Sequence, residues 1–440
     1  MLYYTYNMIA KIVIDKKREG RALGSAEIRA FIDGFTCGSI PDYQMSALAM
    51  AICCRGMTDR ETADLTDAMM RSGRCLEWNL PAPTADKHST GGVGDKLSLV
   101  VQPLAAACGL AVPSLTGRAL GLTGGTADKL ETIPGYNAAL SLDDFQKVVG
   151  EVGVSMTVQT EEITPADRKL YALRDVTGTV ASIPLIVGSI LSKKLAEGAG
   201  TLVFDVKCGS GAFMKTREDA LALAQALVGG AKAAGRRSAA LVTDMNAPLG
   251  RAVGNANEVA EALSVLRGEI PQERPDVALC IELAALMSSL AKGIPVDEAR
   301  SECRERLADG SALAKFEAMV RAQGGDLDAF AGVMAWTTSK FKIQAMRFGV
   351  VAAIDAEKVA KVAFELGAGR GKAGDAIDPR AGVTLEVGVG DKVSLGSPLA
   401  TLEKSGGPDG LEPAAAELLK AFIIAPSAEA RRDLVLERVM

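Results

Sequence analysis

Apolar residues recur at helical spacing through the first 72 residues of the chain, and no alternating strand pattern is found there. Ser25 and Thr58 each begin a segment that is typical of a capped amphipathic helix. Pro41 lies in the first turn of a further predicted helix, where proline is favoured, and this helix runs through Met50. We therefore expect residues 1–72 to be helical.

After Arg74 the pattern changes to short apolar runs that alternate with helical segments. Helical spacing is found at 96–108, from Asp128, and at 165–198, 217–234 and 256–336. Strand-like apolar runs are found at 110–113, 201–207 and 239–243. Two Gly-rich loops, 86–95 and 116–126, precede helices. This alternation predicts an α/β fold with a mixed, largely parallel sheet.

The distribution of these segments predicts three parts. The separated helical segments 1–72 and 165–198 are expected to pack together as one small, discontinuous all-helical domain. Residues 73–164 and 199–336 are expected to form a larger α/β domain, which contains both Gly-rich loops. Residues 337–440, with short strands and Gly turns after Gly382, are expected to form a C-terminal α+β part of the large domain. Because the chain would cross between the first two domains more than once, we expect a cleft between them.

Composition and charge narrow the possible functions. The 440 residues include 49 Lys and Arg against 54 Asp and Glu, a formal net charge of −5. Nucleic-acid binders usually have a basic excess, so we predict no nucleic-acid partner. A single histidine, His88, argues against the usual zinc sites. The eight cysteines include no C-x-x-C pair, so we expect reduced thiols in a cytoplasmic protein.

One uncharged stretch, Leu97 to Gly117, is long enough to cross a bilayer. It contains Pro103, Pro113 and several Gly and Ala residues, so we predict a buried helix, a turn and a buried strand instead of a membrane span. The N-terminus has no basic start followed by an apolar run, and we expect no signal peptide. These patterns predict no membrane partner.

The segment Lys87-His-Ser-Thr-Gly-Gly-Val-Gly-Asp combines a lysine, hydroxyls and glycines just before a predicted helix. Glycines let backbone N–H groups converge on an anion, and a helix N-terminus adds a favourable dipole. Lys87 supplies a positive charge, and Ser89, Thr90 and Ser98 supply hydroxyls. The order differs from a Walker A loop, in which the lysine follows the glycines. The segment predicts a phosphate site, the alternative being an ordinary Gly-rich turn; His88 within it is either structural or catalytic.

A second segment, from Thr116 to Glu131, repeats the combination of hydroxyls, glycines and a helix start. Two such loops in one α/β domain strengthen the prediction of an oxyanion site. Arg118 in this segment is either a ligand residue or a member of a buried structural ion pair.

A third segment, from Tyr171 to Lys194, places basic and hydroxyl groups in otherwise apolar sequence. Ser189 and Lys193 are four residues apart and would share one face of a helix. The alternative is a core helix whose lysines extend to solvent. From the residues alone this alternative is favoured for Lys194, and it ties with a functional role for Lys193.

The three segments together, KHSTGGVGD, TGRALGLTGGTADKLE and YALRDVTGTVASIPLIVGSILSKKLAEG, resemble in order and spacing the motifs of the thymidine and pyrimidine-nucleoside phosphorylases. Thr243-Asp-Met-Asn-Ala-Pro-Leu-Gly and Lys372-Ala-Gly-Asp fit as well, and the likeness covers nearly the whole chain. The resemblance implies a homodimer with an active site between a small helical and a large α/β domain. It implies reversible attack of phosphate on C1′ of a pyrimidine nucleoside (thymidine, deoxyuridine or uridine), giving free base and (deoxy)ribose 1-phosphate.

The resemblance also implies roles for individual residues. The phosphate site would use Lys87, Ser89, Ser98, Thr116 and Thr126. The base site would use Tyr171, Arg174, Ser189 and Lys193, with Leu120, Val180 and Ile186 as apolar walls. His88 falls where the family places a candidate acid near the base O2, so His88, Arg174 and Lys193 are the catalytic candidates. No cofactor is required, and inorganic phosphate is the co-substrate.

Some members of the family hold a potassium ion beside the phosphate loop. The matching positions here are Gly94, Lys96, Leu249, Ala252 and Glu261, most of which would contribute backbone carbonyls. Lys96 stands where the family has a hydroxyl residue. A charged lysine cannot be a metal ligand, and its ammonium could take the place of the ion.

The second loop departs from the usual family pattern. Thr116 replaces Ser, Ala119 replaces Gly and Leu122 replaces His, while Ser114 lies where some broad-specificity members have Lys. These departures affect the expected sugar and base preference more than the reaction. A phosphoribosyl-type transferase on a similar fold is a competing hypothesis, but the carboxylate cluster it needs for magnesium-diphosphate is not found. A non-catalytic nucleoside-binding protein, which would bind without turnover, is the other alternative.

Overall fold

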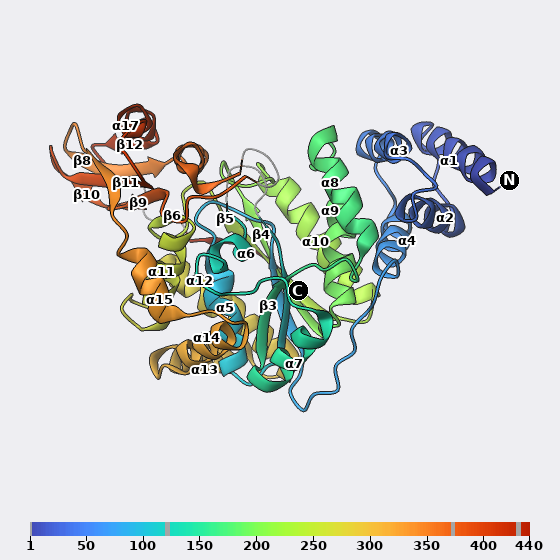
Figure 1. Ribbon diagram of the computed structural model, residues 1–440, viewed down its shortest axis with the longest axis horizontal. Coiled ribbons are helices and arrows are strands. Elements are labelled where there is room, and N and C mark those ends of the chain that lie inside the picture. Colours follow the sequence, from blue (N-terminus) through green and yellow to red (C-terminus); the bar gives the residue numbers. More distant parts are fainter. Residues whose placement is uncertain (1, 119–123, 371–374, 428–432) are drawn as a thin grey trace.

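The computed structural model describes residues 2–118, 124–370, 375–427 and 433–440. Six helices gather at the end of the molecule that carries the N-terminus (Figure 1). They are α1 (Leu2–Arg18), α2 (Ser25–Thr36), α3 (Asp42–Arg55), α4 (Asp59–Met70), α8 (Pro165–Thr177) and α9 (Ile183–Ala196). A shared apolar core joins α1–α4 to residues Ala166, Leu170 and Leu185 of the later pair. The two separated helical segments therefore do pack together.

The central sheet has the strand order β1-β4-β5-β13. Its strands are β1 (Ala85–Ser89), β4 (Thr201–Cys208), β5 (Arg237–Asp244) and β13 (Val435–Val439). The first three are parallel, with Lys87 opposite Val203 and Asp205 opposite Leu241, and β13 is antiparallel to β5. A parallel pair, β2 (Val112–Thr116) and β3 (Val154–Val158), adjoins β1 through the bridge between Thr84 and Ala111. The predicted mixed, largely parallel sheet is confirmed.

Helices cover both faces of this sheet. On one face, α5 (Leu97–Ala107) and α12 (Pro275–Lys292) bury Val203 and Leu241. On the other face, α9 and α10 (Arg217–Ala233) bury Phe204 and Val206. The remaining helices of this part are α6 (Thr126–Leu130), α7 (Leu142–Val152), α11 (Ala256–Leu266), α13 (Val296–Ala308), α14 (Ser311–Ala322) and α15 (Leu327–Met334).

Two small antiparallel sheets with a core of their own form most of the C-terminal part. One has the order β6-β9-β11-β7 and the other β10-β8-β12. Their bounds are β6 (Ala252–Gly254), β7 (Thr338–Gln344), β8 (Gly349–Ile354), β9 (Gly382–Leu385), β10 (Lys392–Val393), β11 (Pro398–Ser405) and β12 (Phe422–Ala425). The associated helices are α16 (Ala356–Ala363), the π-helical turn η1 (Phe364–Ala368) and α17 (Leu411–Leu419).

Two sequence predictions need correction and one is confirmed. Lys87, His88 and Ser89 lie on strand β1, because β4 supplies a parallel partner, and only the residues after Ser89 form the predicted loop. Strands β3 and β13 were not predicted. The uncharged stretch from Leu97 divides into α5, a turn and β2, as expected, and no helix within the described ranges is long and apolar enough to span a membrane.

Candidate active site

Strand β1 divides the first motif between the two faces of the central sheet. Side chains alternate along a strand, so Lys87 and Ser89 point to one face while Asp86 and His88 point to the other. The contacts agree: the Lys87 ammonium lies 3.3 Å from the Ser98 hydroxyl on α5, whereas Asp86 pairs with Lys194 on α9. One short strand therefore presents two chemically different sets of groups to two layers of helices.

On the α5 face, the candidate phosphate residues form a connected cluster. The buried Lys87 ammonium lies 3.4 Å from the carboxylate of Asp205 on β4. The Ser89 hydroxyl donates to Asp95 at 2.5 Å and accepts from the backbone N–H of Gly91 at 3.1 Å. Lys87, Ser89 and Ser98 are thus brought together around the first loop, as predicted.

Asp95 is the carboxylate at the centre of this cluster. Burial would raise the pKa of Asp95, but the ammonium groups of Lys207, Lys87 and Lys129 together hold it well below its ordinary value. An ionised Asp95 also holds the hydroxyl proton of Ser89. Ser89 must therefore turn this hydroxyl away from Asp95 before it can donate to a bound phosphate.

The second loop starts at the end of β2 and leads into α6. Its two ends meet, because the N–H of Ala127 donates to the carbonyl of Gly117 at 3.2 Å, so Thr116 and Thr126 lie in neighbouring positions. Arg118 is exposed and pairs with Glu131 and with the buried Asp128. An ion pair, one of the two alternatives for Arg118, is therefore present, but the guanidinium itself is not buried. The expected wall residue Leu120 and the departures Ala119 and Leu122 lie outside the described residues.

On the α9 face, Lys193 is the most accessible of the candidate base-site cations. Its ammonium contacts Asp167 at 2.5 Å and the Ser189 hydroxyl at 2.9 Å, and lies 5.9 Å from the ring centre of Tyr171. Burial lowers the pKa of Lys193, and the nearby charges of Lys194 and Arg174 act in the same direction against Asp167. Burial also raises the pKa of Tyr171 to about 12, so its hydroxyl stays protonated at neutral pH. The predicted Ser189–Lys193 face is confirmed.

Arg174 fixes the junction between α8 and α9. Its guanidinium is 1% exposed and donates to the carbonyls of Thr179 at 3.2 Å, Leu185 at 3.0 Å and Val180 at 2.7 Å. Three of its five N–H donors are used in this way, leaving two for another acceptor. Val180 is held beside it, and the partly buried Ile186 packs against the core between α9 and α10.

The surroundings of His88 disfavour the protonated imidazole. Burial lowers the pKa of His88 well below its ordinary value, and the ammonium groups of Lys194, Lys193 and Lys87 add to this effect against Asp95. The residue is nevertheless only partly buried. In this state the imidazole is neutral at pH 7 and can donate one N–H hydrogen bond.

Lys194 does not extend to solvent, and the interpretation favoured from the residues alone is wrong. Its ammonium is 1% exposed, pairs with Asp86, and donates to Glu197 at 3.0 Å and to the Leu115 carbonyl at 2.9 Å. Gln102 donates to the other Asp86 oxygen at 2.7 Å and to Ser114 at 3.0 Å. This network ties α9 to β1 and α5 across the sheet.

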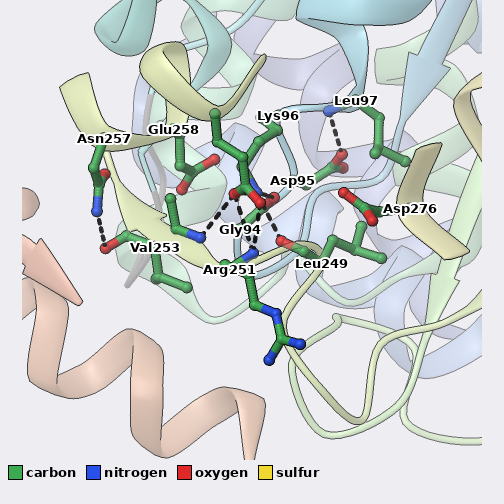
Figure 2. A network of polar contacts seen from close by, with 12 residues as sticks. Gly94, Asp95, Lys96, Leu97, Leu249, Arg251, Val253, Asn257, Glu258 and Asp276 are labelled. Carbon is green, nitrogen blue, oxygen red and sulfur yellow. Dashed lines mark hydrogen bonds and ion pairs between the residues drawn. The ribbon is translucent and has the colours of Figure 1, made fainter. Parts of the chain in front are cut away.

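The positions expected to hold potassium do come together, but they do not fit a metal ion (Figure 2). The ammonium of Lys96 already bonds the carbonyls of Gly94 and Leu249 and the carboxylate of Glu261. Ala252 contributes its N–H to Glu261 at 2.8 Å. The donor set is therefore occupied by a side chain.

Sequence reasoning missed the carboxylates that surround the site. Asp205 accepts from Lys207 at 2.6 Å and from Thr243 at 2.6 Å, and Asp167 orients Lys193. The sequence does contain a sign of the Asp205–Lys207 ion pair. The two residues are two positions apart in an otherwise apolar strand, which places both side chains on one buried face.

Comparisons with known proteins agree with this arrangement. Residues 11–73 match the helical bundle domain of the glycosyl transferase family, and residues 81–313 match its a/b domain. Residues 350–425 match the pyrimidine nucleoside phosphorylase C-terminal domain. The chain is 48% identical over 394 residues to the pyrimidine-nucleoside phosphorylase of Bacillus subtilis (strain 168), covering 89% of this chain and 90% of that protein. It is 43% identical over 438 residues to the thymidine phosphorylase of Mesorhizobium japonicum, covering 98% and 99%.

Among solved structures, the anthranilate phosphoribosyltransferase of Thermus thermophilus superposes with a TM-score of 0.59 at 22% identity, covering 71% of this chain and 99% of that one. At this identity the likeness concerns the fold alone, and it confirms the predicted combination of a helical bundle and an α/β domain. The sequence matches confirm the resemblance carried by the three motifs. The chain belongs to the pyrimidine-nucleoside phosphorylase family.

Proposed function

We propose that the protein catalyses the reversible phosphorolysis of pyrimidine nucleosides, with thymidine, deoxyuridine or uridine as substrate and free base and (deoxy)ribose 1-phosphate as products. The observation that carries the proposal is the division of β1. Lys87 and Ser89 face the Gly-rich loop and α5, and His88 points to the opposite face of the sheet, which is covered by the helix α9 that carries Lys193. Anion-binding groups and base-binding groups thus meet at the end of one strand.

The chemistry of glycosidic cleavage requires such an arrangement. The sugar acquires oxocarbenium character while negative charge develops on the departing base. Lys193 and the two remaining N–H donors of Arg174 can stabilise that charge, as preorganised cations do at developing oxyanions. Neutral His88 can donate an N–H hydrogen bond to a pyrimidine carbonyl. Lys87, Ser89, Ser98, Thr116 and Thr126 would hold phosphate beside C1′, which lowers the entropic cost of the attack.

Base release measured by ultraviolet absorbance tests the proposal. Purified protein is incubated with thymidine, deoxyuridine, uridine or cytidine, with and without phosphate. We expect release only when phosphate is present, and the ranking of the nucleosides gives the sugar and base preference. Binding without release from any nucleoside would favour a non-catalytic binding protein. Base consumption with phosphoribosyl diphosphate and magnesium, in place of phosphate, would favour the transferase alternative.

Phosphate is expected to raise the pKa of His88. Without phosphate, burial and three ammonium groups hold this pKa low, and a bound dianion would offset the charge of the ammonium groups. His88 is the single histidine in the sequence, so the NMR signal of its ring in untagged protein can be followed directly from pH 5 to 8. An unchanged titration at saturating phosphate would contradict a phosphate site beside His88.

Acid is expected to destabilise the fold through His88, because burial lowers the pKa of this imidazole in the folded protein. Below about pH 6.5 the unfolded chain binds a proton at His88 that the folded chain does not. The folded state therefore loses stability as pH falls through this range, by up to about 1.4 kcal/mol per pH unit. A His88→Gln variant should lose less stability over the same range.

A homodimer is part of the proposal, and exposed apolar side chains on two helices support it. Ile12 on α1 is 58% exposed, and Tyr43 and Met50 on α3 are 71% and 43% exposed, although α1 and α3 pack against each other. We expect sedimentation velocity to give a dimer for the wild type and a monomer for Tyr43→Glu/Met50→Glu. An unchanged dimer in that variant would place the interface elsewhere.

The eight free thiols support a reducing, cytoplasmic compartment.

A further inference from the structure

Lys96 places a buried positive charge where three segments of the chain meet (Figure 2). Its ammonium donates to the carbonyl of Gly94 at 2.9 Å and to the carbonyl of Leu249 at 2.7 Å, and it pairs with Glu261 at 2.9 Å. Gly94 belongs to the phosphate loop, Leu249 to the turn before β6, and Glu261 to α11. Two carbonyls and a carboxylate around a compact cation form the kind of donor set that a hard metal cation uses.

The backbone around this ammonium leaves no room for other side chains. Gly250, at φ +68°, lies so close that an added Cβ would be 2.7 Å from the Lys96 nitrogen and 2.8 Å from a Glu261 oxygen. Gly94 also has φ +68°, and an added Cβ there would lie 2.6 Å from the Leu249 carbonyl oxygen. Because these two positions have no side chain, the backbone segments around Gly94 and Gly250 can lie close to the Lys96 ammonium.

The charges of this junction are matched. Burial raises the pKa of Glu261, but Lys96, Arg274 and the N–H of Ala252 lower it to about 2. Burial lowers the pKa of Lys96, and Glu261, Glu258 and Asp276 more than offset this. The Glu261 carboxylate thus has its counter-charges within the chain, 2.9 Å away on Lys96 and 2.8 Å away on Arg274.

We propose that Lys96 is a built-in replacement for a monovalent metal cation at the junction between the phosphate loop and the turn before β6. An ammonium group and potassium have the same charge and similar size, and the lysine stem keeps this one in place at any salt concentration. Lys96 is also the N-cap residue of α5, so its hold on Gly94 and Leu249 fixes the start of the helix that carries Ser98. It is a positioning residue for phosphate, and the protein needs no added potassium.

Thermal unfolding at matched ionic strength in potassium and in choline chloride tests this proposal. The wild type should unfold at the same temperature in both salts. Lys96→Ser removes the ammonium, leaves Glu261 without this partner and supplies a hydroxyl. In choline we expect the variant to unfold about 5 °C or more below the wild type, and potassium should restore much of this loss. Lys96→Met fills the space without charge and should stay destabilised in both salts.

Lys17 offers a matched control. It is equally buried, pairs with Glu61 at 2.7 Å and donates to the Gly56 carbonyl at 3.1 Å, far along the chain in the helical part. Lys17→Ser should be destabilised and gain nothing specific from potassium. Equal restoration of both serine variants would reveal a general salt effect and overturn the proposal. A wild type stabilised by potassium would overturn it without any variant.

The kinetic part of the test rests on the proposed phosphorolysis. In choline, Lys96→Ser should raise KM for phosphate by roughly ten- to a hundredfold with a smaller change in KM for the nucleoside, and potassium should reverse this. Equal changes in both KM values would contradict a positioning role at the phosphate loop. If the wild type shows no phosphorolysis in either salt, the proposed function fails while the unfolding measurements still decide the cation question.

Discussion

Lys87→Met is expected to lower kcat/KM for phosphate by about 10²- to 10³-fold, the range found when one preorganised group that stabilises an anion is removed. The fold should survive this change. Asp205, which lies 3.4 Å from Lys87, retains the ammonium of Lys207 and the hydroxyl of Thr243, each at 2.6 Å. Steady-state kinetics with phosphate and nucleoside varied in turn would measure the effect.

The loss in Lys87→Met should concern phosphate and not the nucleoside. Binding of the nucleoside or free base, measured by calorimetry without phosphate, should change far less than the use of phosphate. Lys215→Met, which removes an exposed lysine, serves as the control and should keep wild-type kinetics. Equal losses in nucleoside and phosphate binding by Lys87→Met would contradict its assignment to the phosphate side of β1.

Lys194→Met is expected to lower the free energy of unfolding by about 3–5 kcal/mol, because removing one partner of a buried ion pair leaves uncompensated charge. The methionine would leave Asp86 facing Glu197 with neither in contact with water. Burial and the neighbouring Asp86 already raise the pKa of Glu197 well above its ordinary value. Urea unfolding, with the midpoint and slope both recorded, would measure the loss.

A second substitution separates charge from packing. Lys194→Met combined with Asp86→Asn removes both members of the ion pair and should recover part of the lost stability. If the double variant is as unstable as the sum of the two single variants, the cost arises from packing alone, and the buried charge is not its cause.

The sequence pattern predicts the layers of this fold well because those layers depend on periodicity. The helices of residues 1–72, the buried strand at 201–207 and the helix at 217–234 all appear where expected. Periodicity is less informative for Lys194, since its spacing on α9 says nothing about the carboxylate that β1 places opposite it. The sequence pattern predicts a loop at β1 for a related reason, because its partner β4 lies more than a hundred residues away in the chain.

The candidate site was predictable by its motifs and not by its electrostatics. Lys87, Ser89 and Ser98 come together as expected, and so do Ser189 and Lys193. Their charge partners Asp95, Asp205 and Asp167 come from three different segments, and a search for basic and hydroxyl groups does not select carboxylates. The cation positions follow from the family resemblance, whereas the ammonium that fills them is evident only from the contacts of Lys96 in the fold.

Strand β13 has a consequence for the synthesis of the chain. It pairs with Ala240–Thr243 of β5, yet it leaves the ribosome only after the whole C-terminal part has been made. During this interval the N–H and C=O groups along that side of β5 have no strand partner, and such an edge is prone to pair with other chains. The newly made protein is therefore most exposed to aggregation late in translation, when nearly all of its functional residues are already present.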